Sequence, residues 1–146
     1  NAMRVDAEYD RTHALLGDYY VQEARALEGE ARLDLFRQAA DEYSLALQYV
    51  AKPKENNLAR YTYSIALAGV YLELDDSAGA ISAYISALEN AQQKDKWRIH
   101  EALSRLHSQI GDKDSAIESA KKALELCPDS ERERLSVYVV GLQTQP

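Results

Sequence analysis

Cysteine, proline and glycine are all scarce in this sequence. Cys127 is the single cysteine, so no disulfide framework can be drawn within one chain, and we expect this residue to be a small buried apolar side chain. Three prolines and six glycines, without any strand-like alternation of apolar and polar residues, leave few places where a helix must break. The sequence therefore predicts an all-α fold, and its 146 residues suffice to bury a core without disulfides.

Concentrated positive charge and long apolar runs are also missing. Seventeen Lys and Arg face 24 Asp and Glu, and the basic residues are scattered. We expect no nucleic-acid partner, because phosphate binding needs a concentrated positive field. The most apolar run, residues 61–72, is far shorter than the ~20 residues that cross a bilayer. We expect a soluble, cytoplasmic protein without a membrane partner, and interpret residues 1–2, ahead of Met3, as a cloning remnant.

The sequence signatures of catalysis and metal binding are not found. There is no Gly-rich phosphate loop, nucleophile elbow or zinc signature. His100 and His107 lie seven residues apart with no third ligand spaced to join them. Paired acids such as Asp75 and Asp76 lie where helix capping and the helix dipole already explain them. We therefore predict that the protein is not an enzyme and has no metal or cofactor.

What the sequence does contain is an apolar helical stripe that occurs three times. The stripes are Ala39, Ala40, Tyr43, Ala46, Leu47 and Val50; Ala80, Ile81, Tyr84, Ala87, Leu88 and Ala91; and Ala116, Ile117, Ala120, Ala123, Leu124 and Cys127. Alanine occupies the first and fourth places each time. Because alanine lets a neighbouring helix come close while the larger residue beside it fills the space, the pattern predicts helices packed in one repeated geometry.

Each stripe follows another apolar helix, and the combination resembles the tetratricopeptide repeat family, whose unit reads W-x2-L-G-x2-Y, then A-x3-F, then A and P. The matching residues are Leu67, Ala68, Tyr71, Ala80, Tyr84 and Ala87 in one segment, and Leu103, Ser104, His107, Gly111, Ala116, Ala123 and Pro128 in the next. The stripes start 41 and 36 residues apart, which is similar to long-period members of the family. Before Ala39, the residues Leu16, Gly17 and Tyr20 stand ten residues further away, which predicts a longer first helix or a longer turn.

The resemblance implies an α-solenoid of about three antiparallel helix pairs, at about 5–51, 56–92 and 96–126, in one repeat domain over residues 3–143. The individual helices are expected at about 5–28, 32–51, 56–73, 77–92, 96–110, 114–126 and 131–143. Acids in the turns, such as Asp76 and Asp112, are expected to cap the next helix, Ser130 and Glu133 to form a capping box, and Gly111 to end the fifth helix.

The last helix, 131–143, places three apolar residues on one side, with Tyr138 beside them: Leu135, Val139 and Leu142. A stack of helix pairs leaves an open apolar end, so we expect this helix to be a cap; the alternative is the first half of a further pair.

The family places its binding surface on the concave side, along the first helix of each pair. The positions that this implies are Arg11, Asp18, Gln22, Thr62, Ile65, Gly69, Glu73, Arg98, Glu101, Arg105 and Gln109. Arg98, Glu101 and Arg105 share one helix face, where two arginines could hold a carboxylate; a solvated face with an internal Arg–Glu pair explains the same residues. Family members that clamp acidic chaperone tails have Lys and Asn on the first helix and Asn on the third, where Ala14, Asp18 and Ala66 stand here, so that activity is not expected.

The functional prediction is a non-enzymatic protein–protein interaction module that binds a peptide or partner helix in the concave groove. One alternative is a regulatory sensor domain that binds a small signalling peptide or metabolite. Another is a homo-oligomeric scaffold, a homodimer through the C-terminal helix, where Val137 and Val140 would be exposed.

Overall fold

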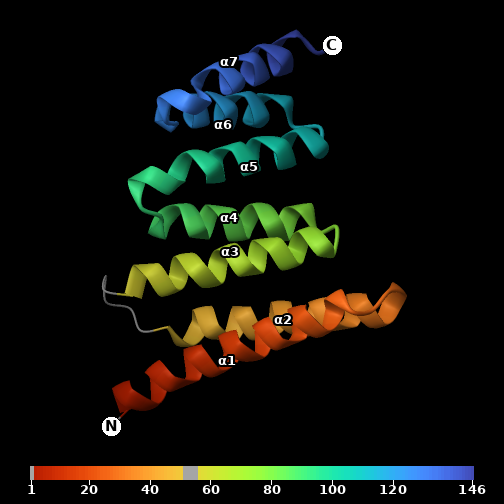
Figure 1. The fold of residues 1–146 in the computed structure, drawn as a ribbon, viewed down its shortest axis with the longest axis vertical. Helices are drawn as coiled ribbons and strands as arrows, with labels where there is room; N and C mark the ends of the chain where they lie inside the picture. Colours follow the sequence, from red (N-terminus) through yellow and green to blue (C-terminus); the bar gives the residue numbers. More distant parts are fainter. Residues whose placement is uncertain (1, 51–55) are drawn as a thin grey trace. The chain divides into compact units, whose positions relative to one another are not determined.

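The computed structural model describes the backbone of residues 2–50 and 56–146, and the side chains of residues 9–50 and 56–146 (Figure 1). Its helices are α1 (Ala2–Arg25), α2 (Gly29–Tyr49), α3 (Asn57–Glu73), α4 (Ser77–Asn90), the 3-10 helix η2 (Gln93–Asp95), α5 (Lys96–Gln109), α6 (Lys113–Leu126) and α7 (Asp129–Thr144). Within this part of the chain the fold is all-α, as predicted, and helix ends lie within a few residues of those expected. The expected end of the second helix, residue 51, lies outside the described residues.

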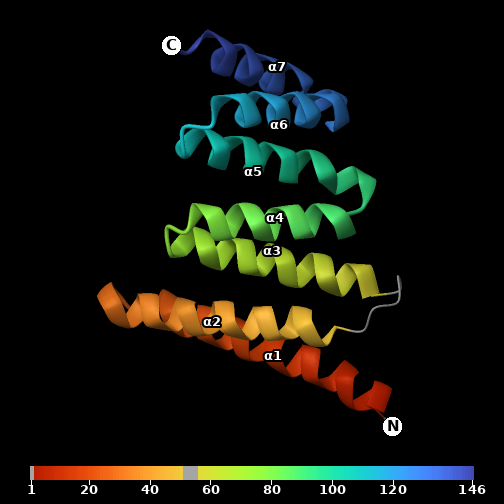
Figure 2. The ribbon, with the colours of Figure 1, turned by 180° about the vertical axis from the view of Figure 1, so that it is seen from behind.

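The chain divides into two compact units, residues 1–90 and 91–146. In the first unit, α1 pairs with α2 and α3 with α4, and α2 packs against α3. In the second unit, α5 pairs with α6, and α7 packs on α6 (Figure 2). Helix pairs thus pack against their neighbours within each unit, as the α-solenoid prediction requires. The extent of a single domain, residues 3–143, stays a prediction.

The alanine stripes form the contacts between paired helices. Ala39, Ala80 and Ala116, which start the three stripes, are each 0% exposed. Across from Ala116, the hydroxyl of the fully buried Ser104 donates a hydrogen bond of 2.7 Å to the Ala116 carbonyl oxygen. A serine on α5 can reach the backbone of α6 only when the two helices lie very close. The prediction that small residues permit close packing is confirmed.

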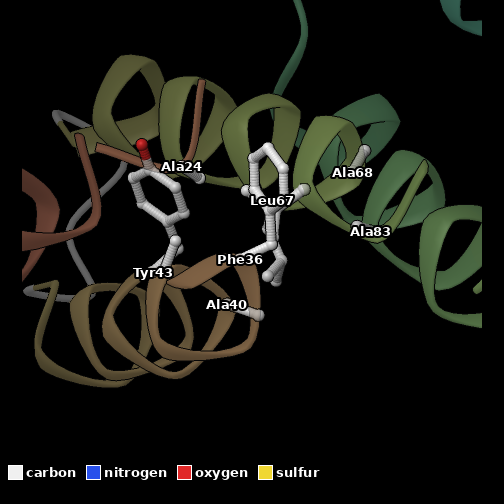
Figure 3. Packing of buried hydrophobic residues seen from close by; sticks show 9 residues of the cluster. Ala24, Phe36, Ala40, Tyr43, Leu67, Ala68 and Ala83 are labelled. Carbon is white, nitrogen blue, oxygen red and sulfur yellow. The ribbon is translucent and has the colours of Figure 1, made fainter. Parts of the chain in front are cut away.

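The core of the first unit joins three helices through Phe36. This side chain is 2% exposed and extends from α2 toward Leu67 of α3 (Figure 3). Tyr43 lies about two helical turns after Phe36 on α2. It packs on Gly17 of α1, where an added Cβ would lie 2.7 Å from the Tyr43 ring. Gly17 therefore lets α1 approach α2, and the two aromatic rings fix α1, α2 and α3 together.

The first pair has longer helices than the others. α1 has 24 residues and α2 has 21, whereas α4, α5 and α6 have 14 each. The turn between α1 and α2 takes only residues 26–28, so the ten extra residues lengthen the helices and leave the turn short. Both views of the ribbon show this hairpin extending past the α3–α4 turn (Figures 1 and 2).

The turns use the expected capping groups, with one exception. Asp76 accepts a hydrogen bond from the Gly79 N–H at 2.8 Å, and Asp112 accepts one from the Ser115 N–H at 3.1 Å. Gly111 ends α5 with a φ of 84°, a left-handed conformation that favours glycine. The capping box expected at residues 130 and 133 is wrong, because α7 already begins at Asp129, after an extended Pro128, and has no side-chain cap.

The C-terminal helix covers the last pair as predicted. Leu135, Val139 and Leu142 are buried, and Tyr138 and Ser104 share a hydrogen bond of 3.0 Å between their hydroxyl oxygens. These contacts hold α7 on both helices of the preceding pair. In the described segments, every helix is too short or too polar to cross a bilayer.

Candidate functional site

A groove of about 640 Å³ opens between α1 and α3, with α2 beneath it. Its apolar surface is formed by Val21, Phe36, Tyr43, Ile65, Ala66, Gly69 and Val70, and its rim by Asp18, Gln22, Arg25 and Glu73. Five of the residues predicted from the sequence therefore meet at one site: Asp18, Gln22, Ile65, Gly69 and Glu73. The volume and the mixture of apolar floor and polar rim are typical of ligand-binding sites.

Gly69 keeps the α3 wall of the groove open. Apart from its chain neighbours and the backbone of its own helix, a Cβ atom built on Gly69 would meet no atom within 4 Å. Ala66, one turn earlier, adds only a methyl group to the same wall. A bulkier residue at Gly69 would project into the groove, so the groove depends on the small size of this residue.

Asp18 and Tyr43 are held together at one end of the groove. The Tyr43 hydroxyl donates a hydrogen bond of 2.5 Å to Asp18 Oδ1. Burial of the ring and this hydrogen bond raise the pKa of Tyr43 far above its usual value. Tyr43 therefore stays neutral, and its hydroxyl proton is already committed to Asp18.

On the rim of the groove, Glu73 forms an ion pair and Arg25, among the described residues, does not. Glu73 forms an ion pair with Arg32 of α2, whose guanidinium also lies 5.0 Å from the centre of the Phe36 ring. Within the described part of the chain, the exposed side chain of Arg25 forms no ion pair. The groove thus has an anionic end at Asp18 and a cationic position at Arg25, with the amide of Gln22 between them.

Beyond the groove, a hydrogen bond joins α1 to α3. The Tyr63 hydroxyl donates to Asp10 Oδ2 at 2.8 Å, and Asp10 is buried. Burial and this bond raise the pKa of Tyr63 to about 12. Two other predicted residues of the first unit, Arg11 and Thr62, do not line the groove; the Thr62 hydroxyl donates to the Leu58 carbonyl within α3.

In the second unit, the carboxylate of the predicted residue Glu101 is already hydrogen-bonded to α7. Both terminal nitrogens of Arg134 donate to its carboxylate at 3.0 Å, and Arg134 Nε donates to Glu131 at 2.7 Å. The side chain of Glu101 is only 13% exposed. Arg105 lies 3.8 Å from the same carboxylate and 5.3 Å from the centre of the Tyr138 ring. Glu101 and Arg105 therefore form the internal Arg–Glu pair that the sequence offered as an alternative to a binding site. Arg134 lies closer to Glu101 than Arg105 does.

The remaining predicted residues of α5 lie apart from this ion pair. Arg98 packs over the ring of Trp97, at 5.2 Å from its centre, and lines a separate hollow of about 520 Å³ beside Cys127. Gln109 is exposed at the end of α5. The second unit therefore does not gather the four predicted α5 residues around one groove, and their role in binding stays a prediction.

Sequence reasoning missed Arg25, Phe36 and Tyr43 as groove residues. Arg25 lies seven residues after Asp18, and so on the same face of α1, which is the signal that would have found it. Tyr43, which the sequence predicts as a core residue, lies in the core and also lines the groove.

The histidines serve structural contacts. His13 Nδ1 lies 2.6 Å from Glu42 Oε2, and its ring stacks on Tyr49. His100 is buried in α5, and this burial, together with Lys122 and Lys96, lowers its pKa. Among the residues with described side chains, no three His, Cys, Asp or Glu lie close enough to bind a metal ion together.

Comparison with known families identifies the pair α5–α6. Residues 98–130 match the model of a family described as tetratricopeptide repeat. No curated protein sequence matches the chain. The matched segment contains the close contact of Ser104 with Ala116 and the Gly111 turn described above. Residues 98–130 of the second unit thus match a tetratricopeptide repeat, which supports the predicted resemblance to that family and suggests a protein–protein interaction module.

Proposed function

We propose that the protein is a non-enzymatic, cytoplasmic interaction module and that the groove between α1 and α3 binds a peptide or a helix of a partner protein. The observation that supports this most directly is the combination of an apolar floor, formed by buried Phe36 and Tyr43, with a polar rim. Protein–protein interfaces bury aromatic and apolar side chains at their centre and surround them with polar groups. The walls belong to packed helices, so little conformational entropy is lost on binding.

Filling the groove at Gly69 tests this proposal. In Gly69→Trp, the new side chain enters the groove from a position where a Cβ meets no other residue. The matched control is Gly141→Trp on α7, where a Cβ also has open space and no groove is involved. Both changes remove a helical glycine, so both variants are expected to stay folded by circular dichroism.

Peptides that bind the wild-type chain are first selected from a displayed random library. We expect Gly69→Trp to weaken the selected peptides at least about tenfold in fluorescence anisotropy, because it occupies their site. Gly141→Trp should leave their affinity within about twofold. Selected peptides that bind Gly69→Trp as well as the wild type would contradict the proposal, as would a library that yields no binder.

One observation favours a second candidate, a homo-oligomeric scaffold. Val137 and Val140 of α7 are 69% and 56% exposed, on the side opposite the buried residues of that helix. If these valines join two copies, Val137→Lys should shift sedimentation velocity toward the monomer. A wild-type chain that sediments as a monomer at every concentration of a dilution series would exclude the scaffold.

A further inference from the structure

We infer that the occupant of the α1–α3 groove is an amphipathic α-helix of a partner protein, which places a basic side chain at Asp18 and an acidic side chain at Arg25. The inference rests on the proposed function and adds to it the conformation and the charge order of the partner.

The groove offers little to the backbone of an extended peptide. The Tyr43 hydroxyl is committed to Asp18, Glu73 is paired with Arg32, and the remaining floor is formed by apolar side chains. Apart from Tyr43, Gln22 is the one uncharged polar side chain of the lining. An extended peptide would leave backbone N–H and C=O groups unpaired there, at about 1–3 kcal/mol each. A helix pairs these groups internally and presents only its side chains.

The α3 wall suits the close approach of a helix. Ala66 and Gly69 lie three residues apart and so on one face of α3, and both line the groove. Small residues at this spacing let a ridge of partner side chains settle between two turns. Ile65 and Val70 lie beside them and provide apolar contact for the partner's own apolar stripe.

The α1 rim sets the charges of the partner. Asp18, Gln22 and Arg25 stand at positions i, i+4 and i+7, so they follow one face of α1 over about 10 Å at 1.5 Å per residue. Only Oδ1 of Asp18 accepts the Tyr43 hydrogen bond, and Arg25 forms no ion pair in the described chain. A complementary helix therefore carries a base and an acid about seven residues apart, beside its apolar stripe.

The test is a charge-order selection on the full-length chain. The library consists of helical peptides of about 18 residues, or five turns, with a fixed apolar stripe and with Lys, Glu or Gln at the flanking positions. It is sorted on the wild type and on the double variant Asp18→Lys/Arg25→Glu. We expect a Lys and a Glu seven residues apart on the wild type, and the same spacing in the reverse order on the double variant. Each peptide class should prefer its own protein about tenfold.

Two further proteins control this experiment. Asp18→Asn keeps an acceptor for the Tyr43 hydroxyl while it removes the charge, so it should lose the preference for Lys even if the double variant folds poorly. Glu118→Lys/Lys122→Glu exchanges an exposed ion pair of α6, outside the groove, and should leave the selected charge order unchanged.

The outcomes separate this inference from the proposed function. Selected peptides that Gly69→Trp excludes, but whose charges are the same on the wild type and on the swapped variant, would overturn the inference and leave the proposed function standing. Enrichment of charges three residues apart would indicate an extended peptide and overturn it too. Peptides that are indifferent to Gly69→Trp would overturn both.

Discussion

The two units use three successive helices in different ways. In α1–α2–α3, the first and third helices are joined by the Tyr63–Asp10 hydrogen bond, and the stretch beyond it stays open as a groove. In α5–α6–α7, the first and third helices are joined at the middle of α5 by Glu101–Arg134. One repeat geometry can therefore give an open groove or a closed surface, depending on where the side chains of the outer helices meet.

The largest expected effect comes from the floor of the open groove. Phe36→Ala should lower the free energy of unfolding by about 3–5 kcal/mol, because it removes a buried ring that joins α2 to α3. Urea denaturation followed by circular dichroism measures this. If the loss is below about 1 kcal/mol, comparable to an exposed site, Phe36 does not hold the groove together.

A smaller effect should follow from opening the closed surface of the second unit. Arg134→Ala removes the two hydrogen bonds that hold α7 on Glu101, so amide exchange in α7 should become faster while exchange in α3 and α4 stays unchanged. Hydrogen exchange with mass spectrometry follows both regions in one sample. Unchanged exchange in α7 would show that its apolar contacts alone hold it in place.

The units should also differ in their response to pH. The folded chain lowers the pKa of His100 below its ordinary value near 6.5, so the unfolded chain takes up a proton first as the pH falls. The free energy of unfolding of the second unit should therefore decrease from about pH 6.5 downward. Thermal unfolding of the wild type and His100→Gln over this range measures the effect, and equal slopes for the two proteins would contradict it.

Tyr63 gives the corresponding response in the first unit, at high pH. Its pKa is raised to about 12 in the folded chain, above the usual value of about 10, so the unfolded chain loses its proton first. Stability should be complete below about pH 10 and decrease as the pH rises toward 12. Tyr63→Phe should reduce this alkaline decrease, and Tyr43, whose pKa is also raised, should account for part of what remains; if the decrease persists unchanged, the Tyr63–Asp10 bond does not contribute to it.

The smallest effects concern the two helical glycines with open space. Gly69→Ala and Gly141→Ala should each raise the free energy of unfolding by up to about 1 kcal/mol, because alanine restricts the unfolded chain and meets no neighbour. Gly17→Ala should have the opposite sign, since its Cβ would lie 2.7 Å from Tyr43. Differential scanning calorimetry of the three variants compares them, and stabilisation by Gly17→Ala would contradict the close contact of α1 with α2.

Most of the fold could be predicted from the sequence because its signals are local. The alanine stripes, the Gly111 turn and the apolar side of α7 each depend on spacing along one helix, and the structure confirms them. The site was harder to predict. Gln22 and Glu73 were found because they hold equivalent positions in the repeat, but the pairing of Arg134 with Glu101 joins residues 33 apart. Such a contact depends on the register of neighbouring helices, which spacing along one helix does not determine.

The sequence also did not determine whether the ten extra residues of the first pair belong to the helices or to the turn between them. Either a long turn or longer helices would have satisfied the apolar pattern. The structure assigns the residues to α1 and α2, and Arg25, the cationic end of the groove rim, is the last residue of the lengthened α1.

Hydrogen exchange of the full-length chain with and without a selected peptide tests the contrast between the units most directly. The account predicts slower exchange in α1 and α3 on binding, and no change in α5, α6 and α7. Protection confined to α5 and α7, with α1 and α3 unaffected, would show that the partner binds the surface described here as closed.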